Sequence, residues 1–325
     1  MAARKSNSVR TARIAEFLGL QRSTVGVLAM VILVGMGERM AERFLPIYIL
    51  ALGGGALAIG LLQAMDNLLS ALYSFPGGYF SDRIGTKRSL FAFNLVAMAG
   101  FTLVILVPAW QAVLAGAVLF ISWSAISLPA TMSLIYKVLP QNKRTMGVSM
   151  HSLVRRIPMA LGPLLGGIFI AVWGERDGVR VAFGAAFAMA VVALLLQQRM
   201  IEDDTPDTAP SAGTCGLTPE KNPLKLMQLM NPAMKSLLIT DILIRFCEQI
   251  PYAFVVIWSM KTITEPVTAV QFGLLTTIEM TTAVLVYIPV AYLADGNTKK
   301  PFVLMTFVFF TLFPLALLYS RSLYW

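Results

Sequence analysis

Nine apolar runs, each about as long as a bilayer-spanning helix, constrain the fold of this sequence more than any other feature. A helix needs about 20 predominantly apolar residues to cross the hydrocarbon core of a bilayer. The runs do not alternate polar and apolar residues, as the strands of a membrane barrel would. The sequence therefore predicts an all-α polytopic membrane protein. The predicted spans are residues 25–51, 56–80, 89–107, 110–136, 147–172, 180–199, 236–260, 269–293 and 302–320.

Composition and charge support this class. The chain is 57% hydrophobic and 13% charged, whereas soluble domains carry about 25% charged residues. The net charge of +9 alone would suit nucleic-acid binding. With a cytoplasmic N-terminus, however, the predicted outer loops hold only Arg176, Arg180, Lys261 and Arg321. Because basic residues concentrate on the cytoplasmic side of membrane proteins, we expect that orientation, a bacterial inner-membrane location and no nucleic-acid partner.

A polar segment divides the chain into two unequal parts. Residues 200–235 are acidic at first and then rich in Pro, Thr, Ser and Gly, a composition typical of a flexible linker. We interpret residues 1–24 as a cytoplasmic lead-in and residues 25–199 as a bundle of six helices. Residues 236–325 then form a partial bundle of three helices on the far side of this cytoplasmic linker.

The two parts are related by an internal repeat. When residues 60–82 are placed over residues 273–295, Asp66 falls on Glu279 and both segments end in Pro-x-x-Tyr-x-x-Asp. Shared apolar residues mean little between two membrane helices, but an acid at the same depth and a common ending indicate true repetition. Repeats of this kind are frequent in transporters.

A charged loop follows the second span and contains a pattern suited to a conformational latch. The residues of this loop are Gly78, Asp82, Arg83, Gly85, Lys87 and Arg88. Asp82 is an anion near a helix end and can approach the positive N-terminus of another helix. The two glycines allow close backbone approach and a positive φ, and the three cations favour the anionic leaflet. The alternative for Lys87 and Arg88 is a role in topology alone.

This loop resembles the signature loop of the major facilitator superfamily, and a degenerate copy ends at Asp295 in the second part. The fifth span contains Gly162, Pro163, Gly166 and Gly167 in a pattern similar to the Gly-Pro-x-x-Gly-Gly motif of the family's antiporters. The resemblance implies two six-helix halves that rock about a central site, with the loops as gating latches. It slightly favours efflux over uptake.

The sequence departs from the family pattern in two respects. Helices ten to twelve have no counterpart, so we expect either an incomplete sequence or a nine-helix protein, and the usual partner of the first loop on the eleventh helix is missing. In addition, Leu119–Ala125 of the fourth span lacks the buried Arg that is common in drug/proton antiporters. This second departure argues against that subfamily.

The first span carries charges that are costly at bilayer depth and therefore indicate function. Glu38 and Glu42 are four residues apart and share one helix face. Because two carboxylates repel each other, we expect one of them to hold a proton at neutral pH. Arg39, three residues before Glu42, can compensate the charge. Glu42-Arg43-Phe44 also resembles the Glu-Arg-Phe of proton-coupled oligopeptide transporters, although Arg39 stands where that motif has Glu.

Further charged residues lie in the other spans and complete the candidate site. They are Asp66 in the second span, Asp241, Arg245 and Glu248 in the seventh, and Glu279 in the eighth. We interpret these acids, with Glu38 and Glu42, as proton sites around a polar cavity. Arg43 or Arg245 would hold an anionic group of the solute or tune a carboxylate. The alternative is a set of structural ion pairs between helices.

The function predicted from these features is secondary active transport, proton-coupled and directed at a small polar or charged solute. Motifs for ATP binding, zinc proteases and nucleophile elbows do not occur, so we expect no enzyme activity, cofactor or metal. The expected partners are the lipid bilayer, the solute and protons, with self-association as a further option. The alternative is a non-transporting membrane sensor, a partner-binding protein or an inactive truncated transporter.

Overall fold

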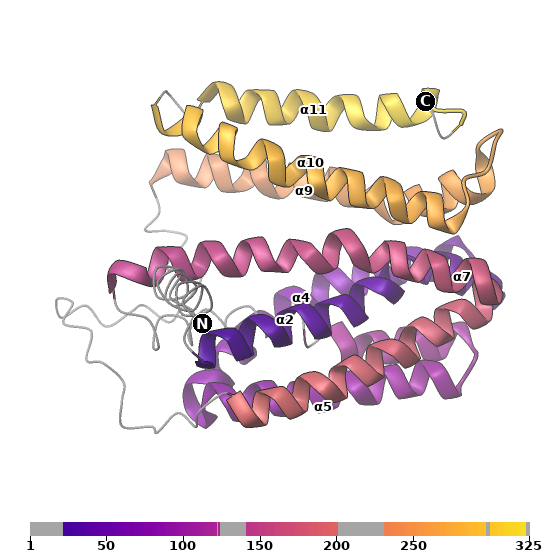
Figure 1. The fold of residues 1–325 in the computed structure, drawn as a ribbon. Coiled ribbons are helices and arrows are strands. Elements are labelled where there is room, and N and C mark those ends of the chain that lie inside the picture. The colour runs from indigo at the N-terminus through magenta and orange to yellow at the C-terminus, as the bar shows by residue number, and fades with distance from the viewer. Residues whose placement is uncertain (1–21, 122, 124–140, 201–230, 297–299, 323–325) are drawn as a thin grey trace, which may run out of the picture.

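The computed structural model describes residues 22–121, 123, 141–200, 231–296 and 300–322, and the regular structure in these ranges is helical. Long helices run back and forth along one axis (Figure 1). This confirms the predicted all-α class. The elements are α2 (Arg22–Glu42), α3 (Leu45–Ala51), α4 (Ala56–Ile84), α5 (Thr86–Leu106), a helix at Trp110–Ile121, α7 (Gln141–Met200), α9 (Pro232–Ile257), the π-helical turn η1 (Trp258–Thr262), α10 (Ala269–Gly296) and α11 (Lys300–Tyr319).

The first predicted span is interrupted, which corrects the expectation of one helix over residues 25–51. Helix α2 ends at Glu42 and α3 begins at Leu45. Pro46 explains the break, because its nitrogen has no hydrogen and its ring would clash with the carbonyl of Glu42, four residues earlier. Phe44 caps α3 with φ −103° and ψ 2°, outside the helical range. The break places Arg43 between two helices.

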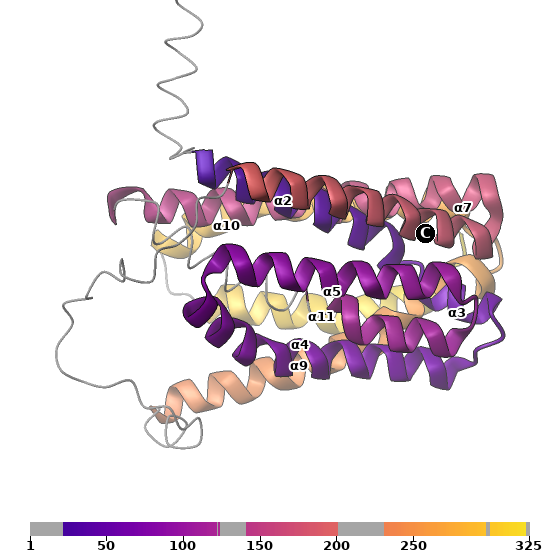
Figure 2. The ribbon, with the colours of Figure 1, turned by 90° about the horizontal axis from the view of Figure 1, so that it is seen from below.

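Helix α7 consists of two arms, which match the predicted fifth and sixth spans. The arms meet at Gly174, which has φ +80° and ψ 173°, a conformation that favours glycine. The chain then turns back on itself (Figure 1). The first arm packs against α2 and α10, and the second arm packs against α2 and α5. Seen from below, α2 and α7 run together along one edge of the molecule (Figure 2).

Four helical segments of the described chain are long and apolar enough to cross a membrane, by length and composition. They are Ala56–Tyr73, Lys87–Leu106, Ser152–Met200 and Ala269–Val286. Large apolar side chains are exposed on the outside of the bundle, such as Leu57 at 88% and Leu318 at 69%. Exposed apolar surface of this extent marks a lipid or protein contact surface in a folded chain. The protein is therefore an integral membrane protein.

Most of the packed core lies in the first half of the chain, and Val256, Val267, Ala269 and Phe272 of the second half join it. Phe101, Phe120 and Phe183 form a cluster whose ring centroids are 5.8 to 5.9 Å apart. Small residues bring helices close together elsewhere: a side chain at Gly37 would come within 2.7 Å of the Ala186 Cα atom. Such contacts are typical of membrane helices, where van der Waals packing takes the place of the hydrophobic effect. This core gives the cavity described next a rigid wall.

Candidate functional site

A cavity of about 570 Å³ lies between helices of both halves of the chain. Its volume is in the range of small-molecule sites. Helices α2, α4 and α7 line it from the first half, and α9 and α10 line it from the second. The charged residues of the lining are Glu38, Arg39, Glu42, Arg43, Asp66, Arg155 and Glu279. Gathering so many charges in a membrane protein costs free energy, which indicates function.

Helix α2 supplies the densest part of this lining. Arg39 Nη1 lies 3.0 Å from Glu42 Oε2, with about a third of each side chain exposed. This ion pair confirms the compensation predicted from their spacing. Glu38 lines the cavity one turn earlier on the same helix face. It also lines a smaller cavity of about 40 Å³ beside Arg155, which has room for a water molecule.

Arg43 lies at the helix break and reaches the second half of the chain. Its Cζ atom is 4.0 Å from the ring centroid of Tyr252 in α9 and 5.4 Å from that of Phe272 in α10. Both distances allow cation–π attraction. The Arg43 Nε atom is buried and has no hydrogen-bond partner among the described residues. The guanidinium group of Arg43 thus connects the first half to aromatic rings of the second half.

Asp66 and Glu279, the two acids matched by the internal repeat, both line the cavity, one from each half. No ion pair joins either of them to another residue of the described chain. Between the halves, Gln63 Nε2 of α4 donates a hydrogen bond to Gln249 Oε1 of α9 over 3.2 Å. The repeat and the polar bridge place both halves around one site.

Some lining residues are not evident from the sequence. Gln63, Gln249, Tyr252 and Thr276 are polar or aromatic residues within apolar spans, and single residues of this kind occur on many helix faces. Arg155 is a cation near the start of the fifth predicted span. Only the packing of α7 against α2 determines that it faces the cavity.

Of the three residues of α9 predicted for the site, only Asp241 has a described side chain. Asp241 is exposed and does not line the cavity, which corrects its expected position. The reason is its depth: it precedes Gln249 by eight residues, which is about 12 Å along a helix. Arg245 and Glu248 lie in α9, but their side chains are outside the described part of the structure.

The predicted latch loop is shorter than expected. Helix α4 continues to Ile84 and α5 starts at Thr86, so Gly78, Asp82 and Arg83 belong to the last turns of α4. Gly85 alone makes the bend between the two helices. Its φ is +94° and its ψ is 149°, which agrees with the positive φ expected from the sequence. Lys87 is half-buried and Arg88 is exposed in the first turn of α5, and Asp295 lies in the last turn of α10. The side chains of Asp82, Arg83 and Asp295 lie outside the described residues.

The Gly-Pro motif lies where α7 meets both of its neighbours. A side chain at Gly162 or Gly166 would clash with Arg39 or Met40 of α2, and one at Gly167 would clash with Ala269 of α10. Pro163 lines the cavity. Thr277 Oγ1 of α10 donates a hydrogen bond of 2.7 Å to the Ala160 carbonyl oxygen in the same arm. The motif therefore brings the backbone of α7 close to α2 and, at Gly167, to α10 of the second half.

Comparison with known proteins gives the family. The Major Facilitator Superfamily model matches residues 27–325. A solved bacterial homolog of the human lysosomal transporter Spinster, inward-facing and unoccupied, has a TM-score of 0.67 and 15% identity. The alignment covers 86% of this chain and 64% of that one. The POT family transporter PepTSo aligns with a TM-score of 0.49 and 13% identity, over 81% of this chain and 52% of that one.

No individually curated protein matches the chain. The alignment of this chain spans 64% of the length of the Spinster homolog. The family match extends over nearly the whole sequence, and the structural likeness shows the same helical fold. The chain belongs to the Major Facilitator Superfamily.

Proposed function

We propose that this chain works as a secondary active transporter, which moves a small polar or charged solute by alternating access and couples that movement to protons. The observation that carries the proposal is the cavity lined by both halves, with the repeat-related acids Asp66 of α4 and Glu279 of α10 among its lining residues. A site between two halves changes its access when the halves rock.

The lining of the cavity supports a polar or charged solute. An apolar solute would leave the charged groups of the cavity without solvation, which is unfavourable. Arg43 is the candidate for an anionic group of the solute, because the described contacts of its guanidinium group are with the aromatic rings of Tyr252 and Phe272. The acids of the cavity are candidates for a cationic group or for the coupling proton.

Proton coupling is supported by the number and placement of the acids. Carboxylates inside a membrane protein recur in proton relays, because protonation removes the cost of the buried charge. Glu38 and Glu42 lie one turn apart on α2, and Asp66 of α4 and Glu279 of α10 line the same cavity. Efflux is the favoured direction, since the antiporter-like Gly-Pro motif lies between the halves.

Solute-driven proton movement in liposomes tests the proposal. Purified protein is reconstituted with a trapped pH-sensitive dye and exposed to an amino acid, a dicarboxylate, a sugar, a sugar phosphate and a quaternary ammonium compound. We expect at least one solute to change the internal pH, and Glu38→Gln and Glu42→Gln each to weaken that change. Folded protein that responds to none of the five classes would contradict proton-coupled transport and favour a non-transporting role.

A further inference from the structure

An ion pair joins the two halves at the end of the bundle that the sequence predicts to be external. Lys261 Nζ in η1 lies 2.5 Å from Glu175 Oε1, just after the Gly174 turn of α7. The side chains are 45% and 33% exposed. Neither residue lines the cavity. The pair therefore lies at the rim of the contact between the halves, accessible to the aqueous phase.

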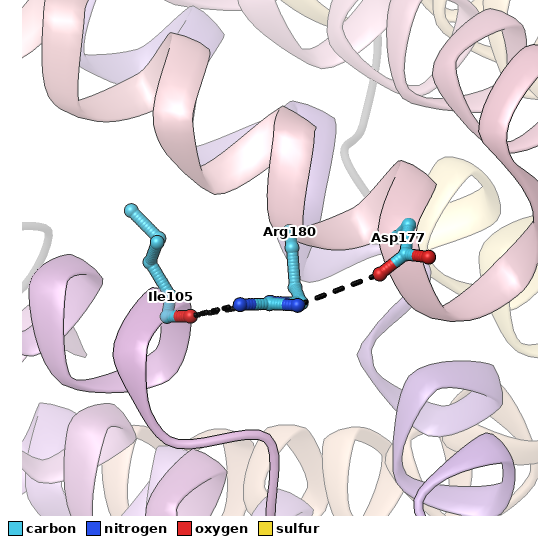
Figure 3. Close-up of polar contacts among 3 residues, drawn as sticks. All are labelled: Ile105, Asp177 and Arg180. Atoms are coloured by element: carbon cyan, nitrogen blue, oxygen red, sulfur yellow. Dashed lines mark hydrogen bonds and ion pairs between the residues drawn. The ribbon is translucent and has the colours of Figure 1, made fainter.

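The turn that carries Glu175 is fixed to the first half. Arg180 donates hydrogen bonds from Nε and Nη2 to the Ile105 carbonyl oxygen, over 3.1 and 2.8 Å. A cation at the C-terminus of α5 is favourable, because the last carbonyls of a helix lack partners. Nη1 of the same guanidinium lies 3.5 Å from Asp177 Oδ1, so one side chain connects α5 to the turn (Figure 3).

The segment that carries Lys261 is fixed to the second half. The Val267 nitrogen donates a hydrogen bond of 2.9 Å to the Ser259 carbonyl oxygen, which closes the loop after η1. The Glu265 nitrogen donates one of 3.2 Å to the Arg321 carbonyl oxygen, just beyond α11. A π-helical turn is rare and often marks a functional position. Each charge of the pair thus moves with its own half.

We propose that Glu175 and Lys261 form a gate that holds this end of the bundle closed, with Arg180 as the positioning residue of the Glu175 turn. The inference rests on the proposed alternating access. The Gly167 contact with Ala269 lies eight residues before Glu175, about 12 Å along α7. A rocking motion about that contact would separate the pair first, because the pair lies farther from the pivot.

The strength of the pair suits a gate. A partly exposed ion pair changes an equilibrium by about 1.5-fold to 5-fold. Alternating access needs states of similar free energy, so a change of this size shifts their populations measurably. A stronger contact would trap one state. Because both side chains are partly exposed, salt in the external solution should weaken the gate.

Distance measurement between two spin labels tests the gate without a solute. Cys215 and Cys247 are replaced by Ser, and labels are attached at Arg176→Cys and Thr264→Cys, two exposed positions on opposite sides of the rim. We expect Lys261→Gln to raise the ratio of long to short distances by about 1.5-fold to 5-fold. Lys261→Glu should raise it further, since two carboxylates then face each other. The double variant Glu175→Lys/Lys261→Glu should restore the distribution of the starting protein.

Arg321→Glu is the matched control, because it makes the same charge change at the same end without touching the pair. Arg180→Gln should shift the distances partway, and high salt should have no effect on Lys261→Gln. The gate is refuted if Lys261→Glu behaves like Arg321→Glu, or if the charge exchange fails to restore the short distance. These outcomes do not depend on solute flux. Absent flux with a responsive gate would instead count against the proposed transport.

Discussion

Arg43 occupies a position that depends on a single neighbouring residue. Pro46 interrupts the helix after Glu42, and the break directs Arg43 toward Tyr252 and Phe272. Arg39, four residues earlier and within α2, has a different environment, because it is paired with Glu42. Two arginines four residues apart thus have separate roles: one compensates an acid of the first half, and the other contacts the second half.

The Arg39–Glu42 pair leads to a prediction about stability. Replacing one partner leaves a partly buried charge, whereas replacing both leaves a neutral pair. We expect Glu42→Gln alone to lower the free energy of unfolding by about 1–3 kcal/mol, and Arg39→Gln/Glu42→Gln to lower it by less. Denaturant unfolding in detergent, followed by tryptophan fluorescence, measures both. Equal or additive losses would show that the two side chains do not interact.

Helix contacts show that the Gly-Pro motif of α7 is a packing feature. Gly166 faces the backbone of Met40, and a side chain there would clash with a carbonyl oxygen that cannot move independently. Gly184, in the second arm of the same α7 helix, has open space at the corresponding position. The two glycines therefore have the same helical setting and different surroundings.

Alanine at these two positions should have opposite effects. We expect Gly166→Ala to lower the free energy of unfolding by about 1–3 kcal/mol through overpacking. Gly184→Ala should leave it unchanged or raise it by up to about 1 kcal/mol, since alanine is the better helix former. Thermal unfolding of the purified variants measures the difference. Similar behaviour of the two variants would mean that α2 and α7 are not in close contact at Gly166.

Residues that differ in character from their neighbours could be predicted as site residues from the sequence alone. Glu38, Asp66 and Glu279 stand out because acids are rare in apolar runs, and all three line the cavity. Tyr252 and Gln249 give no such signal, because only helix packing determines which face of α9 meets the site. The break at Glu42 had a visible cause in Pro46, whereas the pairing of Glu175 with Lys261 depends on how distant loops meet.

At the scale of the whole molecule, the internal repeat makes Asp66 and Glu279 equivalent acids that face one cavity from two halves. If both belong to the proton path of the proposed transporter, Asp66→Asn and Glu279→Gln should each reduce solute-driven proton flux by about tenfold, which corresponds to a rise of about 1.4 kcal/mol in the activation free energy. The double variant should have nearly the same flux as either single variant, because both acids would act in series on one proton path.

Asp241→Asn is the matched control, since this exposed acid of α9 lies outside the cavity and should leave flux intact. The liposome assay with the trapped pH dye compares the four proteins. A loss with Asp241→Asn equal to that of the cavity variants would place the proton path elsewhere, along α9.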